Sequence, residues 1–525
     1  MFLNYCFLVG RFLEKGFVPK VGVRMKINRE YSVRLVVGVF LLIFGLCSFP
    51  KRVTATITLS TFNQGKGTLS ADVRIIYRHE FWDWFKPLAQ PNNNNDYRYF
   101  FTRSLVELKL ALPNFQAFIQ AQDVHMWGLP DDAVANPPAG PMGAGANYFS
   151  HGHQQDYSST IIRQAYLDIQ KLFTKGLSLR WGRFDYLDSM EVTYENPKVN
   201  WLKEMRLAER LIGPFTWSSF NRSFDGFKVG YDLEKFNLTS LIAHPTQGGF
   251  ENDAHKTIEG IDLASFTFTS KYNQWIPNCE ERFFYIYYKD HRNMPKVDNT
   301  LVGSGLNQGD IKIHTFGMHW LGTAKLGKGF FDGLMWGVYQ TGDWGDLDHN
   351  AWAGTVEIGY QFSACPWTPW FRAGYFISSG DDDPTDDNHE TFYQLLPTVR
   401  KYALFPFFNQ MNNEDVFVQA VLKPLPRLSL RADIHFLQLQ ETNDRWYMGA
   451  GATRERGTIF GYQGRPSFGD KELGTLADIT MSYFFNQYFS GLIYFGHVFG
   501  EEVIKNNYPQ GDDANFGYVE LSLTF

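Results

Sequence analysis

Cysteine is scarce in this sequence, and long apolar runs are missing from most of it. Only four of the 525 residues are cysteines, and only Cys279 and Cys365 lie beyond the N-terminal region. Their spacing fits no zinc site and two cysteines are too few for a disulfide scaffold, so we interpret both as structural. Beyond residue 55 no stretch approaches about 18 consecutive apolar residues, which excludes membrane-spanning helices.

Positive charge is also in short supply. The chain has 49 Lys and Arg against 55 Asp and Glu, and without the nine basic and two acidic residues of positions 1–55 the balance is 40 against 53, a net charge of −13. Nucleic-acid-binding proteins usually carry a basic surplus, so nucleic acid is not an expected partner. The sequence also lacks an HExxH zinc motif, a phosphate-binding glycine loop and a Gly-x-Ser-x-Gly nucleophile elbow, and we expect no enzymatic activity.

The N-terminus has the layout of a secretory signal peptide. Basic residues precede an apolar run over residues 35–49, and a signal-peptidase site fits after Ala55. Because residues 1–24 precede this signal awkwardly, Met1 and Met25 are alternative start positions. We therefore expect two parts, an extension with a cleaved signal peptide and a single exported domain, which cover residues 1–55 and 56–525.

Aromatic residues are abundant for a chain that is polar on average. Phe, Trp and Tyr make up 17% of the residues, yet the mean hydropathy is negative. Several segments alternate apolar and polar side chains with a period of two, as β-strands do when their faces meet different surroundings. In the clearest segment, 427–437, one face carries Leu428, Leu430, Ala432, Ile434 and Phe436. In an exported chain this pattern predicts a barrel with lipid-facing aromatic residues and a polar, water-filled interior.

The strand-like segments number about eighteen, and the connections between them are sorted by length. Alternate connections are short, for example Pro113-Asn114 and Asn486-Gln487. The intervening ones are long and polar, as in 128–159, 185–221, 379–412 and 439–472. Bacterial barrels have short periplasmic turns and long extracellular loops, whereas a soluble β-sandwich has no reason to sort its loops. We therefore predict an all-β protein, a closed antiparallel transmembrane β-barrel of about 18 strands with both termini in the periplasm.

The last strand-like segment ends at the C-terminus itself. Its apolar face consists of Val519, Leu521, Leu523 and the terminal Phe525. A terminal aromatic residue on such a strand resembles the signal that the barrel-assembly machinery reads, so Phe525 is the predicted assembly signal. The expected location is the outer membrane of a Gram-negative-type bacterium, with membrane lipid, lipopolysaccharide and the assembly machinery as partners.

Several short motifs resemble the alginate export family of outer-membrane barrels. The most specific is Asn221-Arg222-Ser223-Phe224-Asp225-Gly226, which is similar to the family's Arg-Ser-Phe-Asp-Gly segment. Other similar segments, in chain order, are 73–78, 120–123, 163–168, 182–185, 379–381, 391–392, 396–398, 428–447 and 474–479. The resemblance covers nearly the whole exported domain. It implies an eighteen-stranded barrel with a strongly cationic constriction for a polyuronate, and periplasmic export partners.

Basic residues recur on the strand faces that we expect to line the interior. With two acidic neighbours, the predicted solute path consists of Arg74, Arg78, Arg103, Arg180, Arg183, Arg222, Lys228, Arg431, Asp225 and Asp433. Clustered arginines attract anions and bind carboxylates bidentately, which favours passage of an anionic polysaccharide or of other anionic or polar solutes. The alternative is that these arginines pair with Asp or Glu and only hold the wall rigid.

Other functions are compatible with the same barrel. A general diffusion porin without a polysaccharide role would use one inward-folded loop as its constriction. An outer-membrane hydrolase is the enzymatic alternative, although His435 and His497 accompany no nucleophile motif. The acidic balance departs from an alginate exporter, but we expect much of this charge in loops, including Asp343, Asp346 and Asp348.

An acidic run after residue 380 is the one candidate metal site. Asp381, Asp383 and Asp386 could contribute oxygen ligands to a calcium ion, which requires about six to eight of them. The spacing does not match an EF-hand, because Pro384 interrupts the run. A solvated acidic loop without metal is the simpler interpretation, and no other cofactor is expected.

Overall fold

The computed structural model describes residues 56–86, 96–129, 154–249, 251–297, 299, 306–307, 309–398 and 401–525. The predicted extension and signal peptide, residues 1–55, lie outside the described residues. In the part of the chain that is described, no helix is both long enough and apolar enough to cross a bilayer.

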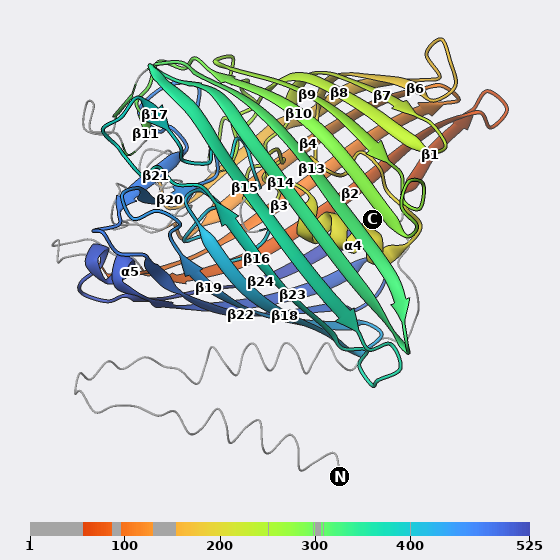
Figure 1. Ribbon diagram of the computed structural model, residues 1–525. Coiled ribbons are helices and arrows are strands. Elements are labelled where there is room, and N and C mark those ends of the chain that lie inside the picture. The colour runs from red at the N-terminus through yellow and green to blue at the C-terminus, as the bar shows by residue number, and fades with distance from the viewer. Residues whose placement is uncertain are drawn as a thin grey trace. The chain divides into compact units, whose positions relative to one another are not determined.

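Eighteen long antiparallel strands form one sheet that closes on itself. In chain order they are β2 (Gly67–Asp83), β3 (Asp96–Leu112), β4 (Phe115–Trp127), β5 (Tyr157–Gln170), β6 (Leu177–Phe184), β7 (Phe224–Asp232), β8 (Phe236–Pro245), β9 (Ile261–Ser270), β10 (Cys279–Asp290), β13 (Ile311–Leu326), β14 (Gly329–Trp344), β15 (Leu347–Gln361), β16 (Trp370–Ser378), β18 (Glu414–Leu425), β19 (Leu428–Gln438), β22 (Glu472–Phe484), β23 (Phe489–Gly500) and β24 (Asp513–Thr524). Each pairs with the next, and β24 pairs with β2 to close the ring (Figure 1). The predicted closed barrel of about eighteen strands is confirmed.

Successive side chains on these strands face the outside and the interior in turn. The outward positions carry large apolar side chains that remain exposed, such as Ile242 at 67%, Trp181 at 54% and Ile358 at 54%. Their inward neighbours, for example Leu241 and Glu357, are buried. An apolar outer belt of this kind matches the hydrocarbon layer of a bilayer, as the alternation in the sequence predicts.

The connections at the two ends of the barrel differ in length, as predicted, with one exception. At the end that we call the turn end, strands are joined by short turns, from two residues between β18 and β19 to eight between β9 and β10. At the opposite, loop end most connections are long, but β14 and β15 are joined by Gly345 and Asp346 alone. Gly345 adopts a φ of +62°, which a tight turn of this kind requires. Asp343 and Asp348 therefore lie on strands, and their predicted placement in a loop is wrong.

Three of the long connections fold into the barrel. Residues 185–223 include the short helix α4 (Pro197–Leu202) and the π-helical turn η1 (Lys203–Leu207), and Figure 1 shows α4 within the ring of strands. We call these residues, with 379–413 and 439–471, the inward segments. They contribute buried apolar side chains to a core shared with the barrel wall, including Leu211, Phe392, Leu396 and Phe460. Such side chains would face water in an external loop, so burial favours the inward path. The interior that we predicted to be water-filled is therefore partly occupied by chain, and α4 extends toward the turn end, where Trp201 contacts Trp370 at the start of β16.

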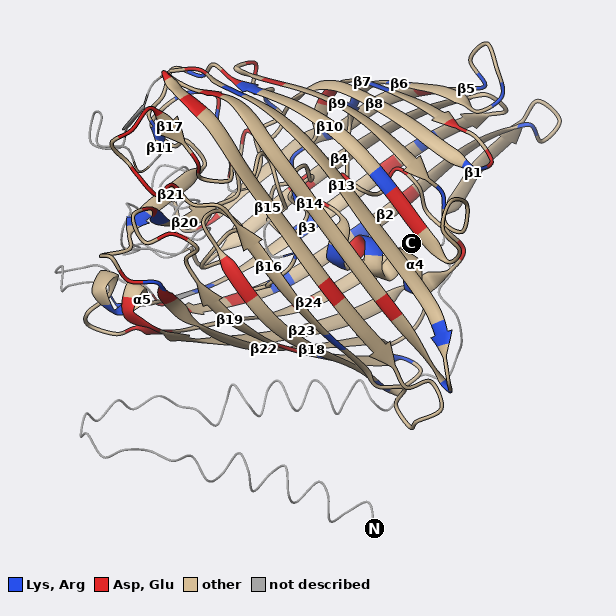
Figure 2. Ribbon diagram, in the orientation of Figure 1, with Lys and Arg blue, Asp and Glu red and all other residues tan. Residues whose placement is uncertain are grey.

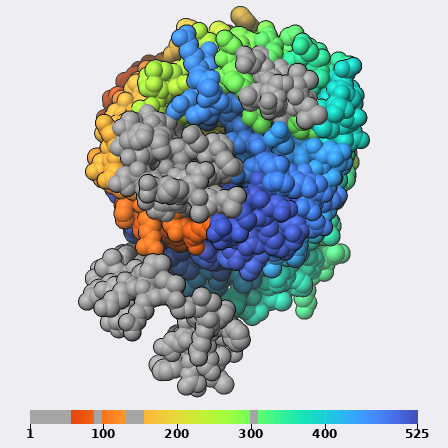
Figure 3. Space-filling model, turned by 90° about the vertical axis from the view of Figure 1, so that its left-hand side faces the viewer, coloured from red at the N-terminus to blue at the C-terminus, as the bar shows by residue number. Residues whose placement is uncertain are grey.

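The remaining short elements lie in the long connections. They are β11 (Lys296–Val297), β12 (Leu306–Asn307), β17 (Asn388–His389), β20 (Arg445–Gly449), β21 (Tyr462–Pro466) and α5 (Glu502–Asn507). Strands β20 and β21 form a separate hairpin within an inward segment. Figure 3 looks onto the loop end, where blue atoms from the C-terminal part of the chain lie across the face of the barrel.

The first and last strands meet at the turn end. Strand β1 (Ile57–Phe62), which the sequence analysis did not anticipate, pairs with the start of β2 and continues the line of β24. At the junction the Phe525 amide donates to the Val73 carbonyl at 2.8 Å, and the Val73 amide donates to the Phe525 carbonyl at 3.1 Å. The Phe525 ring stacks on Tyr488 with 6.1 Å between the ring centroids. The terminal residue thus takes part in closing the ring.

We predict that replacing Phe525 with Ala slows insertion into membranes, because the variant loses the ring contact with Tyr488 in the turn before β23 and the predicted assembly signal. Heat-modifiable gel mobility, followed during assembly, measures the effect. Phe173→Ala is the matched control, since Phe173 lies in a turn at the same end and is 95% exposed. Equal assembly rates for Phe525→Ala and the unaltered protein would contradict the prediction.

Candidate functional site

The interior of the barrel is rich in buried charges, and most of them are arranged as ion pairs with an inward segment. Figure 2 shows basic and acidic residues gathered around α4. Glu357 on β15 accepts from Arg206 Nε at 2.8 Å, from Arg210 Nη2 at 3.3 Å and from Arg372 Nη1 at 2.9 Å. Arg372 also donates to Asp332 on β14 at 3.0 Å. Because the side chains of all five residues are at most 3% exposed, this cluster connects an inward segment to the wall where water cannot screen the charges.

A second group of charges on β10 holds the start of the same inward segment. Glu280 accepts from Lys203 Nζ at 2.6 Å, and Arg282 lies 2.7 Å from both Asp188 and Glu191. Burial raises the pKa of Asp188 to about 6, although the charge of Arg282 opposes the shift. Residues 185–207 are therefore fastened to the wall by opposite charges along their length.

Three of the predicted path residues hold the inward segments through backbone carbonyls. Arg78 Nη1 donates to the Trp217 carbonyl at 2.7 Å, and Arg103 Nη1 donates to the Ser218 carbonyl at 2.6 Å. Arg222 is fully buried and donates to the carbonyls of residues 396 and 452 at 3.0 and 2.8 Å, so it joins all three inward segments. Burial lowers the pKa of Arg222 to about 10, which still leaves the group charged at neutral pH. Because Arg222 is buried among these carbonyls, it does not face a solute, and its predicted place in the solute path is wrong.

The other inward members of the predicted set fall into two kinds. Arg180 pairs with Asp168 at 2.6 Å, and Arg431 pairs with the buried Asp433 at 2.5 Å, as the alternative of a rigid wall expects. Arg74 is exposed on the inner face of β2, and Lys228 is half-buried on β7. No ion pair of Arg74 or Lys228 occurs within the described ranges, so both charges remain available to a solute.

Arg183 and Asp225 do not line the interior. They face each other across β6 and β7, with Arg183 Nε 2.6 Å from Asp225 Oδ1. Both have the same strand parity as the outward side chains Trp181 and Phe227, which are 54% and 50% exposed. The prediction of a lumen position is wrong for these two residues. They form a polar outer rim, which we define as the outward charged residues at the loop-end edge of the apolar belt, where outward side chains are no longer all apolar.

Four arginines on neighbouring strands form a cationic cluster, which we define as Arg74, Arg78, Arg103 and Arg163. Arg103 lies close enough to the other three for their charges to interact. The β4–β5 register shifts next to Arg163, and this bulge leaves both Arg163 and Gln164 buried and in contact with Gln120. Arg78 is partly neutralised by Glu80 and Glu520, and Arg163 by Asp185.

Sequence reasoning missed the residues of the Glu357 cluster. Arg372 could have been assigned to the inner face of β16, because it follows the outward Phe371 in the alternating pattern of that strand. Arg206 and Arg210 carried no such signal, because they lie in a long connection whose inward path depends on tertiary packing.

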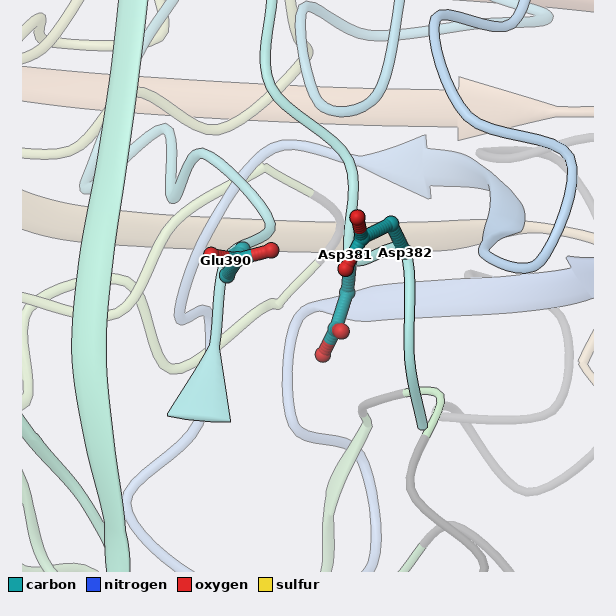
Figure 4. Close-up of side chains that lie close together, drawn as sticks. All are labelled: Asp381, Asp382 and Glu390. Carbon is teal, nitrogen blue, oxygen red and sulfur yellow. The ribbon is translucent and has the colours of Figure 1, made fainter. Parts of the chain in front are cut away.

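The acidic run after β16 is only partly arranged as predicted. Asp381 is buried, whereas Asp383 and Asp386 are exposed and accept hydrogen bonds from their own turns. The carboxylates that lie together are those of Asp381, Asp382 and Glu390 (Figure 4). Burial and the nearby carboxylate of Asp444 raise the pKa of Asp381 to about 7, and burial raises that of Asp444 to about 6. The predicted grouping of Asp381 with Asp383 and Asp386 is therefore wrong, and a different acidic group takes its place.

We predict that Glu357→Gln loosens the inward segments, because it leaves three buried guanidinium groups without their shared carboxylate. The cost of removing one partner from a buried ion pair is about 3–5 kcal/mol. We expect faster proteolysis within residues 185–223 and larger, noisier single-channel conductance than in the unaltered protein.

Asp343→Asn is the control for this change, since its partner Lys312 lies 3.5 Å away in a pair whose side chains are 45% and 55% exposed. Exposed pairs of this kind contribute little to stability. Unchanged proteolysis and conductance in Glu357→Gln would show that the cluster does not hold the segment.

Solved structures share the fold at low sequence identity. OccK9 (OpdG) of Pseudomonas aeruginosa has a TM-score of 0.52 and 9% identity, and OccAB4 of Acinetobacter baumannii has a TM-score of 0.50 and 10% identity. The outer membrane protein OpdK of Pseudomonas aeruginosa has a TM-score of 0.50 and 8% identity. In each case the alignment covers 87% of this chain and 98% of the other. These likenesses concern the barrel fold alone.

A comparison with curated protein sequences gives no match. The sequence profile of the family described as Alginate export, by contrast, matches residues 70–517, which is nearly the whole barrel. The match begins in β2 and ends in β24, so it spans both strands of the closing seam. This chain belongs to the alginate export family.

Proposed function

We propose that this protein is a channel of the bacterial outer membrane, without enzymatic activity, that passes anionic polysaccharides or other anionic solutes. Family membership and the barrel fold support an outer-membrane channel. The apolar outer belt with its polar rim supports contact with lipid and lipopolysaccharide. Proteins that deliver the solute would meet the barrel at its turn end.

The observation that carries the choice of an anionic solute is the cationic cluster of the inner wall. Four guanidinium groups interact there through their charges, and three of their acidic neighbours, Glu80, Glu520 and Asp185, offset only part of them. Arg103 is satisfied by carbonyl oxygens and keeps its full charge. Arg74, the exposed member of the cluster, is open to an anion and its guanidinium group matches the geometry of a carboxylate, whereas Arg78, Arg103 and Arg163 are buried and act on a solute only through their charge.

The wall nearer the turn end presents two accessible cations to a passing solute, Arg74 of the cationic cluster and Lys228. Arg74 is exposed, and Lys228 lies within the electrostatic field of Arg180. Asp72 and Glu107, which face each other across β2 and β3, place acidic groups on the same wall. A chain of uronate residues would therefore move between alternating charges rather than bind one strong site, which permits release as well as entry.

The inward segments support a second candidate, a diffusion porin for small solutes. A porin is constricted by loop residues inside its barrel, and residues 185–223 occupy such a position. Under this alternative the ion-paired segments stay in place while small solutes pass around them. Under the polysaccharide proposal they must move to admit a polymer, so the two candidates differ in whether a polyuronate blocks or traverses the pore.

We predict that the unaltered channel prefers anions and that Arg74→Ala/Lys228→Ala moves its reversal potential toward cation preference in a salt gradient. Removing one positive charge near a passing ion changes the energy of that ion by on the order of 1 kcal/mol in water, in opposite directions for an anion and a cation. Each charge removed should therefore lower the anion permeability by about five-fold and raise the cation permeability by a similar factor. Planar-bilayer recordings measure the shift. Added polyuronate should interrupt the current of the unaltered channel more than that of the variant.

Lys325→Ala/Lys328→Ala is the matched control, because it also removes two cations but from the exposed end of β13 and the turn that follows it. Its reversal potential should stay close to that of the unaltered channel. Cation preference in the unaltered channel, or an equal shift in the control, would refute the anion path and leave the porin alternative.

A further inference from the structure

A group of three carboxylates follows strand β16, outside the solute path proposed above. One carboxylate oxygen from each of Asp381, Asp382 and Glu390 lies within 4.8 Å of the others. Two ligands on opposite sides of a calcium ion, each at about 2.3–2.6 Å, are separated by about 5 Å. The three oxygens therefore lie close enough together to bind a single ion of this size (Figure 4).

The backbone holds this group in place without using its carboxylates. Ser379 Oγ donates to the Glu390 carbonyl at 2.7 Å, and this hydrogen bond brings the two ends of the acidic run together. The Asp381 amide donates to Asp444 Oδ2 at 3.1 Å, and Asn443 Nδ2 donates to the Asp382 carbonyl at 2.6 Å. The arrangement is thus preformed by contacts between two inward segments, 379–413 and 439–471.

Asp381 provides an independent indication of a ligand. Its side chain is 1% exposed, yet neither carboxylate oxygen receives a hydrogen bond from any described residue. Burying a carboxylate without donors or a counter-charge is costly, and buried charges in proteins are normally paired or coordinate a metal. No basic side chain within the described ranges forms an ion pair with Asp381, so a cation would fill the role that Lys203 plays for the buried Glu280 and Arg282 for the buried Asp188.

We propose that Asp381, Asp382 and Glu390 bind a calcium ion that ties two inward segments together at the loop end. The ligand set contains oxygen alone, which suits a hard cation and disfavours metals that prefer nitrogen or sulfur. Calcium accepts the irregular geometry of loop ligands and completes its shell with water, which can reach the exposed Asp382, whereas magnesium demands a near-ideal octahedron. This site goes beyond the proposed transport function and does not depend on it.

The same acidic run supplies its own control residues. Asp383 Oδ1 accepts from the Thr385 amide at 3.0 Å and from its hydroxyl at 2.6 Å. Asp386 accepts from the Asn388 amide at 2.8 Å and from Asn388 Nδ2 at 2.7 Å. These carboxylates are exposed and already satisfied, so they add negative charge to the run without belonging to the site.

The test is isothermal titration calorimetry of the detergent-purified protein, freed of bound metal by a chelator, with calcium chloride and then magnesium chloride. We expect one equivalent of calcium to bind more tightly than magnesium. Asp381→Asn and Glu390→Gln should each weaken calcium binding by about tenfold or more, since even residues behind the ligands of metal sites commonly contribute that much. Asp383→Asn/Asp386→Asn should bind within about two-fold of the unaltered protein, because it removes only charge outside the site.

A second measurement covers variants that fold poorly. Calcium should slow proteolysis of residues 379–413 and 439–471 in the unaltered protein and in Asp383→Asn/Asp386→Asn, but not in Glu390→Gln. Heat-modifiable mobility shows in each case that the barrel itself is intact. The proposal is overturned if the unaltered protein binds no calcium at millimolar concentration, if Asp381→Asn and Glu390→Gln bind as well as it does, or if the control variant loses binding equally. Calcium bound only by copurified lipopolysaccharide would appear as the second of these patterns, with equal binding in all variants.

Discussion

Closure of the sheet is the constraint on which the rest of this structure depends. In hydrocarbon no water satisfies a free amide or carbonyl, so a β-sheet can cross a membrane only if its first and last strands pair. Here β24 pairs with β2, and the Phe525 backbone extends the seam to Val73. Once the ring is closed, each strand has one face toward lipid and one toward the interior. The apolar belt and the charged interior follow from this division.

Inside the barrel the constraint falls on side chains rather than on the backbone, because a charged side chain that is removed from water is stable only when an opposite charge or a hydrogen-bond partner compensates it. Most of the inward arginines solve it by pairing with acids or by donating to carbonyls of the inward segments. Glu357 pairs with arginines from both the wall and an inward segment, so the same contacts that neutralise the wall also position the segment. The barrel is consequently narrowed by ion pairs that can separate only when water replaces them. A barrel built this way combines a constriction held by ion pairs with charged side chains on its inner wall.

The cationic cluster and the acidic group after β16 represent exceptions to this pairing rule, and they have opposite sign. In the cluster, Arg103 has backbone oxygens in place of a carboxylate, so positive charge is left over near the middle of the wall. In the acidic group, Asp381 has no donor at all among the described residues. Both are positions where the folded chain alone does not balance its charge. Such positions are where a protein meets ions or solutes from outside.

Local sequence patterns were sufficient to predict the closed barrel, the number of its strands and the end at which most of its long connections lie. These features follow from local patterns, because side chains alternate along each strand and Arg431 or Asp433 can be assigned to the inner face from neighbours such as Ile434. The path of the long connections, the arginines that are neutralised and the carboxylates that lie together could be found only from the packing of the folded chain. Arg222 looked like a path residue but is buried among carbonyls from three segments far apart in the chain. Contacts of that kind depend on the mutual packing of distant segments, which no local periodicity encodes.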